Sequence, residues 1–600
     1  MNADKTVKLS DYVFDYIKRL GVKDVFMLSG GGCMHLCDSL GRSGIHYICC
    51  LHEQGAAIAA LAYSQYKNDF GVALVTTGPG STNALTGVAG AWAESVPLMI
   101  ISGQVKTADI SGKSGVRMLG FQEAPTVDIV KPVTKYSVTV TDPLKIKYHL
   151  DKAVYIAKAG RPGPVWIDIP LDVQAARINP AKLEDYKPVI KPARSLKKEA
   201  LKVLSMIEKS QRPVMMAGYG IRLSGSVNDF LKLVKMLGIP VLTTWKGADL
   251  LTDENEYFFG RPGTAGQRGA NFILQNSDLF ISLGARLDFG QIGFEHSTFA
   301  REAKKIIVDI DSAELKKFKF NIDMPVNTDC GSLIREMLSL KPSPKECGAW
   351  LDYCALVNKK YPVVLPEYRR KKHYISTYAL AEEISRNMKV GDILVPGSSG
   401  MCGEIPMQVF KFKKGQRSLN SPGIGSMGFG VPSALGACVA GGKKRVVCTN
   451  GDGGFQMNIQ ELETIRRLNL PVKFFVLNND GYASIKATQR NYFGGFYVGS
   501  NRRSGVTLPD TIKIAKAYGL KAFYLDKTSS IKKEIKKIFN TKGPVICEVM
   551  IDPMETVSPK VSSAVGADGK MFSKPLEDLY PFLPRSEFLK NMLIKPIKEC

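Results

Sequence analysis

The residues with the clearest chemical meaning form two short motifs. The first, Gly451–Phe455, reads Gly-Asp-Gly-Gly-Phe, and the second is the pair Asn478 and Asn479. The run Arg445–Thr449 precedes the first motif and Val472–Leu477 precedes the second, and both runs are typical of buried strands. Neighbouring strands lie about 4.8 Å apart. If these two strands are neighbours, the motifs meet at the carboxyl end of one parallel sheet.

Asp452 and Asn479 then supply a carboxylate and an amide oxygen at one point. Such oxygens can share a hard cation, which often bridges to phosphate groups. The glycines allow backbone N–H groups to approach a phosphate, and a predicted helix from Asn458 to Leu468 favours the anion at its N-terminus. The alternative is a tight turn followed by an Asn-rich turn without a ligand. The strand–helix–strand spacing favours the cation and phosphate site.

Glu53 is a further candidate. It follows the short predicted strand Tyr47–Leu51 and opens an Ala-rich predicted helix, Glu53–Tyr66. Taken alone, Glu53 is a helix-start charge that the helix dipole favours.

The spacing from Gly-Asp-Gly to Asn-Asn resembles the signature of the thiamine diphosphate-dependent enzymes. The resemblance implies a Mg²⁺ ion held by Asp452, Asn479 and the main-chain carbonyl of Gly481. It implies that Glu53 lies beside the aminopyrimidine ring and activates the cofactor. Further cofactor-binding positions implied by the resemblance are Gly31, Ser399, Gly400, Gly425, Met427, Gly453, Gly454, Tyr482 and Ala483. In the family the two halves of the site come from two subunits, which implies a homodimer or tetramer with active sites at the subunit interface.

Within that family, the first third of the chain is most similar to the acetolactate synthase catalytic subunit. The similar segments are His52–Ala56, Thr77–Asn83, Ser102–Gln104, Phe121–Glu123 and Gly160–Val165. The resemblance implies that Pro79 and Asn83 line the cofactor site. It also implies that Phe121, Gln122 and Lys135 edge the substrate channel, with Lys135 attracting the carboxylate of a 2-oxo acid. The alternative for Lys135 is an ordinary surface lysine.

The middle third is similar to the FAD-carrying domain of acetolactate synthase. Its glycine turns at strand ends, with arginine and aspartate nearby, are suited to phosphate and ribose groups. The flavin-binding residues implied by this resemblance are Gly218, Gly220, Gly266, Arg268, Arg286 and Asp309. Related enzymes keep this fold without flavin, so the fold alone does not assign the ligand.

The chain departs from acetolactate synthases in three places. The second arginine that they carry after the position of Arg286 is replaced within Asp288–Gln291, and Thr488 stands where they have a tryptophan that sets acceptor size. Their Gln-His pair beside the diphosphate is replaced within Ser398–Met401. The donor half of the site is therefore expected intact, and the acceptor half is expected to be wider.

The predicted reaction is decarboxylation of a 2-oxo acid, with pyruvate as the expected donor, and transfer of the remaining unit to a keto acceptor. One alternative acceptor is a nucleotide-linked keto sugar, as in enzymes of sugar pathways that resemble acetolactate synthase, and it would suit the basic residues Lys486, Arg490, Arg502 and Arg503. A simple 2-oxo acid decarboxylase would also fit the motifs. So would a homologue that binds flavin or regulates a partner without catalysing a reaction.

The alternation of short apolar strands and helices predicts an α/β protein with three doubly wound parallel-sheet domains. We expect a pyrimidine-binding domain at 1–175, a central flavodoxin- or Rossmann-like domain at 190–340, a diphosphate-binding domain at 373–555 and a tail at 556–600. Proline-rich segments at 176–198 and 341–372 are the expected linkers. Gly163-Pro164-Val165 is echoed by Gly543-Pro544-Val545, which hints at duplicated outer domains.

Composition excludes several classes of protein. The 600 residues carry a net charge of +25, but the lysines are scattered and form no block of five or six like charges. We therefore expect no nucleic-acid partner. The 12 cysteines contain no Cys-x-x-Cys motif, the N-terminus has no signal-peptide pattern, and no apolar run reaches the length of a membrane span. A cytoplasmic enzyme without a membrane partner is expected.

Overall fold

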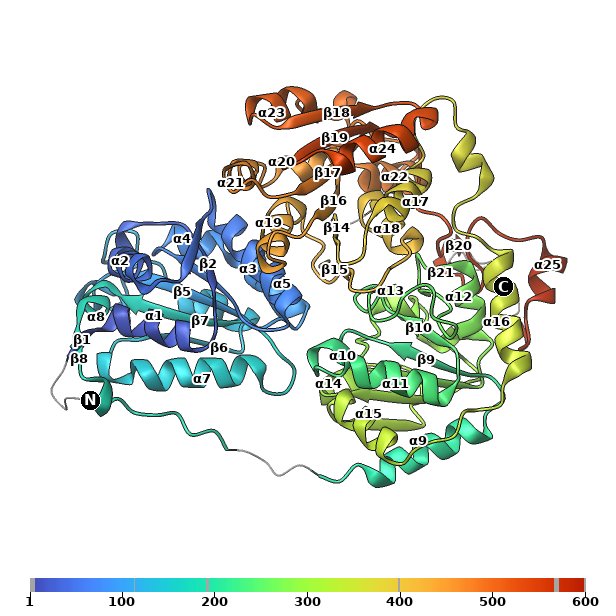
Figure 1. The fold of residues 1–600 in the computed structure, drawn as a ribbon, viewed down its shortest axis with the longest axis horizontal. Coiled ribbons are helices and arrows are strands. Elements are labelled where there is room, and N and C mark those ends of the chain that lie inside the picture. The colour runs from blue at the N-terminus through green and yellow to red at the C-terminus, as the bar shows by residue number, and fades with distance from the viewer. Residues whose placement is uncertain (1–5, 113, 190–193, 398–399, 566–570, 598–600) are drawn as a thin grey trace.

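The computed structural model describes residues 6–112, 114–189, 194–397, 400–565 and 571–597. These residues form three α/β domains, each built on one parallel sheet (Figure 1). In that view the first domain lies at the left in blue and cyan, the middle domain at the lower right in green, and the third at the top in orange and red. The fold class predicted from the sequence is confirmed, and each main sheet falls within one of the predicted domain ranges.

The first domain contains a six-stranded sheet in the order β3-β2-β4-β5-β7-β6. Its strands are β2 (Asp24–Met27), β3 (His46–Cys49), β4 (Gly71–Val75), β5 (Leu98–Gln104), β6 (Tyr136–Thr139) and β7 (Val165–Pro170). Its helices are α1 (Leu9–Arg19), α2 (Met34–Ser43), α3 (Glu53–Lys67), α4 (Pro79–Asn83), α5 (Leu85–Ala93), α6 (Thr126–Val130), α7 (Ile146–Lys158) and α8 (Leu171–Ala175). A two-stranded antiparallel pair, β1 (Val7–Lys8) with β8 (Arg177–Ile178), joins the two ends of the domain.

The third domain has a six-stranded sheet in the order β15-β14-β16-β17-β19-β18. Its strands are β14 (Ile393–Pro396), β15 (Arg417–Ser418), β16 (Val446–Gly451), β17 (Val472–Asn478), β18 (Lys521–Leu525) and β19 (Val545–Met550). Its helices are α17 (Thr377–Asn387), α18 (Glu404–Val409), α19 (Gly430–Ala440), α20 (Asp452–Gln456), α21 (Glu461–Arg467), α22 (Ala483–Tyr492), α23 (Thr511–Ala517) and α24 (Ile531–Asn540).

The two outer sheets have the same connectivity. Numbered along each domain, the strands follow the order 2-1-3-4-6-5 in both sheets. The Gly-Pro-Val echo in the sequence falls at the start of β7 and of β19, which occupy equivalent places in the two sheets. The order supports the duplication that this echo suggested.

The middle domain has a five-stranded parallel sheet in the order β10-β9-β11-β12-β13. Its strands are β9 (Pro213–Ala217), β10 (Val241–Thr243), β11 (Leu279–Leu283), β12 (Lys304–Asp309) and β13 (Met324–Asn327). Its helices are α9 (Lys197–Lys209), α10 (Gly220–Leu223), α11 (Val227–Leu237), α12 (Arg268–Gln275), α13 (Phe289–Ile292), α14 (Ser312–Lys316) and α15 (Cys330–Ser339).

The outer domains of one chain share a hydrophobic core through α3 and α19. Both helices are rich in alanine and glycine, and almost every residue of each is buried. A Cβ atom at Gly436 of α19 would lie 1.9 Å from the carbonyl oxygen of Ala59 in α3, so only glycine allows this approach. Small residues therefore bring the two helices into close contact and fix the first domain against the third.

The second predicted linker is not simply a linker. Helix α16 (Gly348–Lys360) lies within it and packs against α12 of the middle domain. Trp350 on α16 is 4% exposed, and its indole N–H donates to the carbonyl of Pro213 over 2.9 Å. The prolines on both sides suggested an extended segment, but the apolar face between them forms a helix because it can cover the middle sheet.

The tail also belongs to the middle domain. It contains β20 (Ser563–Val565), β21 (Met571–Ser573) and α25 (Arg585–Lys590). Side chains on and beside α12 donate hydrogen bonds to main-chain carbonyl groups of the tail. Asn271 donates to the carbonyl of Leu576, Arg268 to those of Leu579 and Pro581, and Asn276 to that of Asn591. The tail predicted as a separate segment at 556–600 therefore packs as part of the middle domain. Within the residues that the structure describes, no helix is long and apolar enough to cross a membrane.

Candidate active site

The two motifs of the third domain meet at the carboxyl edge of its sheet. Strands β16 and β17 are paired, with Gly451 opposite Leu477, so the residues that follow them are neighbours. Asp452 is 3% exposed and receives three backbone hydrogen bonds. The N–H of Gly453 donates to its Oδ1 over 2.8 Å, and those of Asn479 and Gly481 donate to its Oδ2 over 3.0 and 3.1 Å. Burial raises the pKa of Asp452, and these donors oppose that rise.

The side-chain oxygen of Asn479 indicates whether a cation fits at this site. Its side-chain Oδ1 is buried and accepts no hydrogen bond from the residues that the structure describes. A buried carbonyl oxygen that accepts no hydrogen bond lowers the stability of the fold unless a ligand binds to it. This oxygen belongs to a residue whose own N–H donates to the Oδ2 of Asp452. The donor set of carboxylate, amide oxygen and nearby main chain therefore fits a hard divalent cation.

Two glycines shape this edge. Gly481 has a φ of +121°, and an added Cβ would lie 2.3 Å from the carbonyl oxygen of Ser500. An added Cβ on Gly453 would lie 2.3 Å from the ring of Tyr482. Tyr482 therefore packs directly on the backbone of Gly453, while Gly454 and Ala483 stay partly exposed at the starts of α20 and α22. Two of the predicted diphosphate residues, Gly453 and Tyr482, are therefore in direct contact.

Lys486 is drawn into this site rather than toward solvent. It is 8% exposed, and its Nζ donates to the main-chain carbonyls of Asn479 and Asp480 over 2.5 and 3.3 Å. Burial lowers the pKa of Lys486, and the negative charges of Asp452 and Asp480 partly offset that decrease. The sequence suggested that Lys486 attracts a charged acceptor, but the structure makes it a support of the Asn479 loop.

Other predicted cofactor residues lie along loops of the third domain. Gly400 has a φ of +63°, and an added Cβ would lie 2.6 Å from the hydroxyl of Ser484 on α22. Gly425 has a φ of +58°, and Met427, two residues on, is partly buried. Ser399 lies outside the described residues.

Glu53 lies at the carboxyl edge of the first sheet, after β3. It is 6% exposed, and the side-chain amide of Asn83 donates to its Oε2 over 3.0 Å. An added Cβ on Gly80 would lie 3.3 Å from its Oε1, so this oxygen lies against the start of α4. The ring of His52 caps the helix by accepting from the N–H of Gln54 over 3.0 Å. The structure thus joins Glu53 and Asn83, which are 30 residues apart.

Gly31, Pro79 and Gln122 are brought to the same edge. Gly31 follows β2, and Pro79 begins α4 after β4. Gln122 has a φ of +62°, and its carbonyl oxygen would lie 2.2 Å from a Cβ on Gly78. Gly78, itself at a φ of +59°, therefore allows the Gln122 loop to pack against the turn before Pro79.

Lys135 is not brought to this edge. It directly precedes β6, and its N–H donates to the carbonyl of Pro164, which directly precedes β7. It therefore lies at the amino end of the parallel strands, opposite to Glu53. Its Nζ donates to the carbonyl of Ala159, and burial lowers its pKa to about 8. We assign Lys135 no role at the reaction centre, because the carboxyl ends of the strands hold the other candidates.

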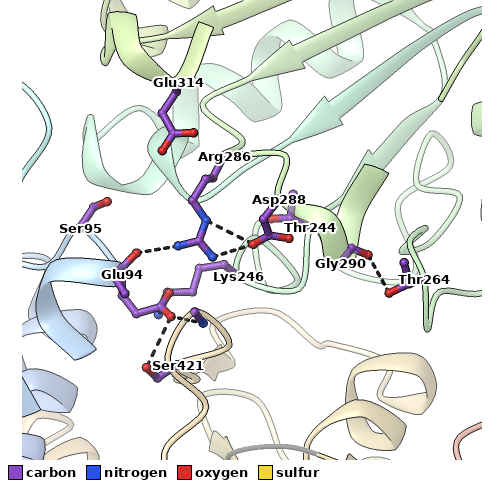
Figure 2. A network of polar contacts seen from close by, with 12 residues as sticks. Glu94, Ser95, Thr244, Lys246, Thr264, Arg286, Asp288, Gly290, Glu314 and Ser421 are labelled. Carbon is purple, nitrogen blue, oxygen red and sulfur yellow. Dashed lines mark hydrogen bonds and ion pairs between the residues drawn. The ribbon is translucent and has the colours of Figure 1, made fainter. Parts of the chain in front are cut away.

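A large cavity lies where the three domains meet. Its volume is about 720 Å³, and its lining includes Gly220, Arg286 and Asp309 of the predicted flavin-binding residues. Figure 2 shows the polar network on its wall. Arg286 pairs with Asp288 over 2.6 Å and donates to the carbonyl of Ala93 in the first domain over 2.7 Å.

Glu94 joins all three domains at this cavity. Its Oε2 lies 3.4 Å from the Nζ of Lys246 in the middle domain, and its Oε1 accepts from the N–H of Gly423 in the third domain over 2.6 Å. Both side chains of the ion pair are nearly buried. Sequence motifs gave no signal for Glu94 or Lys246, because their meaning depends on contacts between domains.

Two features of the cavity favour a polar ligand. Tyr219 lines it, and the hydroxyl of this residue has no hydrogen-bond partner within the described residues. Burial raises the pKa of Asp309, at the end of β12, to about 6. A ligand with hydroxyl or phosphate groups would satisfy such atoms.

Three predicted flavin-binding residues are not on the lining. Gly218 and Gly220 allow close packing against the loop at Gly284, where a Cβ on Gly218 would lie 2.2 Å from a carbonyl oxygen. Gly266 makes a tight turn with Gly263. Arg268 faces the tail and donates to its carbonyl groups. Of these four residues, only Gly220 reaches the cavity.

Known protein families match all three domains. Three family models match the chain: the thiamine pyrophosphate enzyme N-terminal TPP binding domain at residues 7–129, the central domain at 201–337 and the C-terminal TPP binding domain at 398–549.

The chain is also similar to curated acetolactate synthases. The large subunit of Pyropia yezoensis is 34% identical over 92% of this chain and 93% of the relative. The Lactococcus lactis large subunit is 32% identical over 94% and 96%, and the chloroplastic acetolactate synthase 1 of Zea mays is 32% identical over 93% and 87%. The chain is therefore a thiamine pyrophosphate enzyme and belongs to the acetolactate synthase family.

Proposed function

We propose that this enzyme decarboxylates pyruvate with thiamine diphosphate and Mg²⁺ and joins the remaining two-carbon unit to a keto acceptor. The observation that carries the proposal is the convergence at Asp452, where the loop of Asn479 and Gly481 wraps a buried carboxylate and leaves the Oδ1 of Asn479 without a donor among the described residues. Asp452, Asn479 and the main chain at Gly481 would hold the cation. When bound, thiamine diphosphate supplies the electron sink for loss of CO₂.

Glu53 is the proposed proton-exchanging group. Its Oε2 is held by Asn83, which leaves Oε1, beside Gly80, to hold or release a proton toward the aminopyrimidine ring. Burial at the start of α3 keeps water away from this carboxyl group. A positioned carboxyl group of this kind contributes about 10²- to 10⁴-fold to a rate.

The acceptor is proposed to be larger than the second pyruvate used to form acetolactate. Thr488 on α22 is exposed and small where a tryptophan is expected, and Phe121 in the candidate channel loop is 84% exposed. These positions support an acceptor of the keto sugar class. A simple decarboxylase is the second candidate, favoured by the absence of that same tryptophan.

We also propose that FAD fills the cavity at the three-domain junction. The cavity volume of about 720 Å³ suits a dinucleotide, and Arg286, Asp309 and the hydroxyl of Tyr219 offer partners to phosphate and ribose. Two copies of the chain are proposed to form the active unit in the cytoplasm. The exposed apolar side chains of Met118, Leu119, Phe121, Tyr492, Phe493 and Phe496 support a partner subunit over these loops.

A donor and acceptor panel tests the proposal. Purified protein with thiamine diphosphate and Mg²⁺ is offered pyruvate alone and pyruvate with keto sugars, and the products are read by mass spectrometry. We expect CO₂ release and a ligation product with the larger acceptor. Acetolactate formed rapidly from pyruvate alone argues for the ordinary reaction, and free acetaldehyde as the sole product argues for the simple decarboxylase.

A further inference from the structure

Glu461 is a fully buried carboxylate that contacts another domain of the same chain. It lies at the start of α21 in the third domain and is 0% exposed. Its Oε1 accepts from the N–H groups of Leu51 and His52 over 2.9 and 3.2 Å, and its Oε2 accepts from the hydroxyl of Thr464 over 2.8 Å. The first two donors are 410 and 409 residues away from it in the chain. These two N–H groups belong to the residues that directly precede Glu53.

The fit of Glu461 against α3 is close. An added Cβ on Gly55 would lie 2.5 Å from Oε1 and 2.9 Å from the carboxyl carbon of Glu461. Gly55 therefore leaves the space that the carboxylate occupies. His52 is the N-cap residue of α3, so Glu461 places a negative charge where the helix dipole favours one. Burial raises the pKa of Glu461, and the N–H groups of Leu51 and His52 oppose that rise.

The third domain holds this turn at a further point. The strand β3 ends at Cys49 and α3 begins at Glu53, so Leu51 and His52 belong to the connection. Leu51 is 52% exposed and packs little against the core. Arg467, also on α21, donates to the carbonyl of Cys49 over 3.0 Å. Two residues of α21 thus hold the turn that precedes Glu53: Arg467 binds its start at Cys49, and Glu461 binds its end at Leu51 and His52.

We propose that Glu461 is a positioning residue for the reaction: it fixes the turn at Leu51 and His52 so that the Glu53 carboxyl group keeps its direction toward the cofactor. The inference rests on the proposed function of Glu53, and it adds that the diphosphate-binding domain sets the geometry of the pyrimidine side within one chain. A displacement of about 1 Å at a reacting group can cost about 100-fold in rate.

The test compares Glu461→Ala with Glu461→Gln. The glutamine amide oxygen can still accept from both N–H groups, so Glu461→Gln is expected to keep most of the wild-type kcat. Glu461→Ala is expected to lower kcat about tenfold or more, with the KM for pyruvate little changed. Glu463→Ala is the matched control, since Glu463 lies on the same helix, its side chain is 36% exposed and it pairs only with Arg466 among the described residues.

A second readout needs neither cofactor nor substrate. Amide hydrogen exchange of the cofactor-free protein, followed by mass spectrometry, should show faster exchange in a peptide covering residues 49–56 in Glu461→Ala, and wild-type exchange in Glu461→Gln and Glu463→Ala. If Glu461→Ala does not fold, Glu461→Asp takes its place, because the shorter side chain withdraws the carboxylate from the turn.

The outcomes separate the two proposals. Unchanged kcat and unchanged exchange in a folded Glu461→Ala protein overturn the positioning role, as does a Glu461→Gln protein that loses as much activity as Glu461→Ala. Glu53→Gln is measured in parallel. If Glu53→Gln keeps its activity, the role of Glu53 itself fails, together with the positioning role built on it. If Glu53→Gln loses activity and Glu461→Ala does not, only the positioning role fails.

Discussion

Asn83 donates a hydrogen bond of 3.0 Å to the Oε2 of Glu53, and this bond gives the two carboxyl oxygens different surroundings. One oxygen is held by an amide that cannot titrate. The other faces Gly80 at the carboxyl edge of the first sheet. A buried carboxyl group with one fixed oxygen is a group prepared for proton exchange at the other.

Replacing Glu53 tests that arrangement. Glu53→Gln keeps the size of the side chain but cannot exchange a proton, so kcat should fall about 10²- to 10⁴-fold. Binding of thiamine diphosphate with Mg²⁺, measured by calorimetry, should change little, because the residues around Asp452 are untouched. Gln54→Ala serves as the control at the next position. A Glu53→Gln enzyme with wild-type kcat would contradict the assignment.

Removing the unpartnered oxygen of Asn479 tests the cation site. This oxygen accepts no hydrogen bond from the described residues, so the fold should persist in Asn479→Ala, but the variant lacks one proposed ligand of the metal. Affinity for thiamine diphosphate in the presence of Mg²⁺ should fall about tenfold or more, equivalent to about 1.4 kcal/mol. Asp480→Asn is the control, since Asp480 is exposed and asparagine tolerates its φ of +60°. Equal affinities in Asn479→Ala and wild type would remove Asn479 from the site.

The width of the acceptor side depends on Thr488 in the proposed reaction. Thr488→Trp should narrow the range of acceptors toward the size of pyruvate and lower kcat/KM for larger keto compounds. Thr488→Val keeps the side-chain volume and should leave the range as it is in the wild type. The acceptor range of each protein is measured by offering a small and a large acceptor together and reading the product ratio by mass spectrometry. A product ratio that is the same in all three proteins would place the acceptor elsewhere.

Flavin content tests the junction cavity. Arg286→Ala removes a guanidinium group that lines the cavity, so the visible absorbance of bound flavin per folded protein should fall. Arg335→Ala, at a largely exposed position of the same domain, should retain it. Wild-type protein that stays colourless after addition of FAD would assign the cavity to another ligand.

The pKa of Lys135 gives a stability prediction. Its folded-state pKa of about 8 lies below the ordinary value of 10.5, so between these pH values the unfolded chain holds a proton that the folded chain lacks. Stability therefore gains from this group as pH rises from about 8 to about 10. Lys135→Met should lose that gain, seen as a smaller shift of Tm with pH than in the wild type. It should also keep kcat, because Lys135 lies at the far edge of the sheet, and a large loss of kcat would contradict that placement.

Apolar runs predict the buried strands well, because a strand covered on both faces needs few polar residues. The predicted runs Arg445–Thr449 and Val472–Leu477 match the central strands β16 and β17 to within a few residues. They do not reveal the edge strands β6, β15 and β18, which are short or half-exposed and alternate weakly. Helix α16 escapes prediction because the prolines on either side of it favour an extended segment, although none lies within the helix.

Some residues of the candidate site can be predicted from local sequence motifs, and others cannot. Asp452, Asn479 and Glu53 stand at fixed places after strands, so local motifs point to them. Glu461 and Glu94 do not stand out in the sequence, because each acquires its meaning from N–H groups of a different domain. Arg268 shows the opposite error: it lies in a glycine-rich motif that suggests a flavin, yet it contacts carbonyls of the tail 311 and 313 residues away.

The contacts between α12 and the tail have a consequence for how this protein is made. The side-chain amides of Asn271, Gln275 and Asn276 each make one of their hydrogen bonds to an acceptor that lies 302 to 315 residues later in the chain. On a ribosome that adds about 5–20 residues per second, the middle domain must wait roughly 15–60 seconds for these partners. The sheet and the closing strand pair of the first domain lie within residues 7–178, so these elements have no such delay. The middle domain is therefore second to be synthesised and last to be completed.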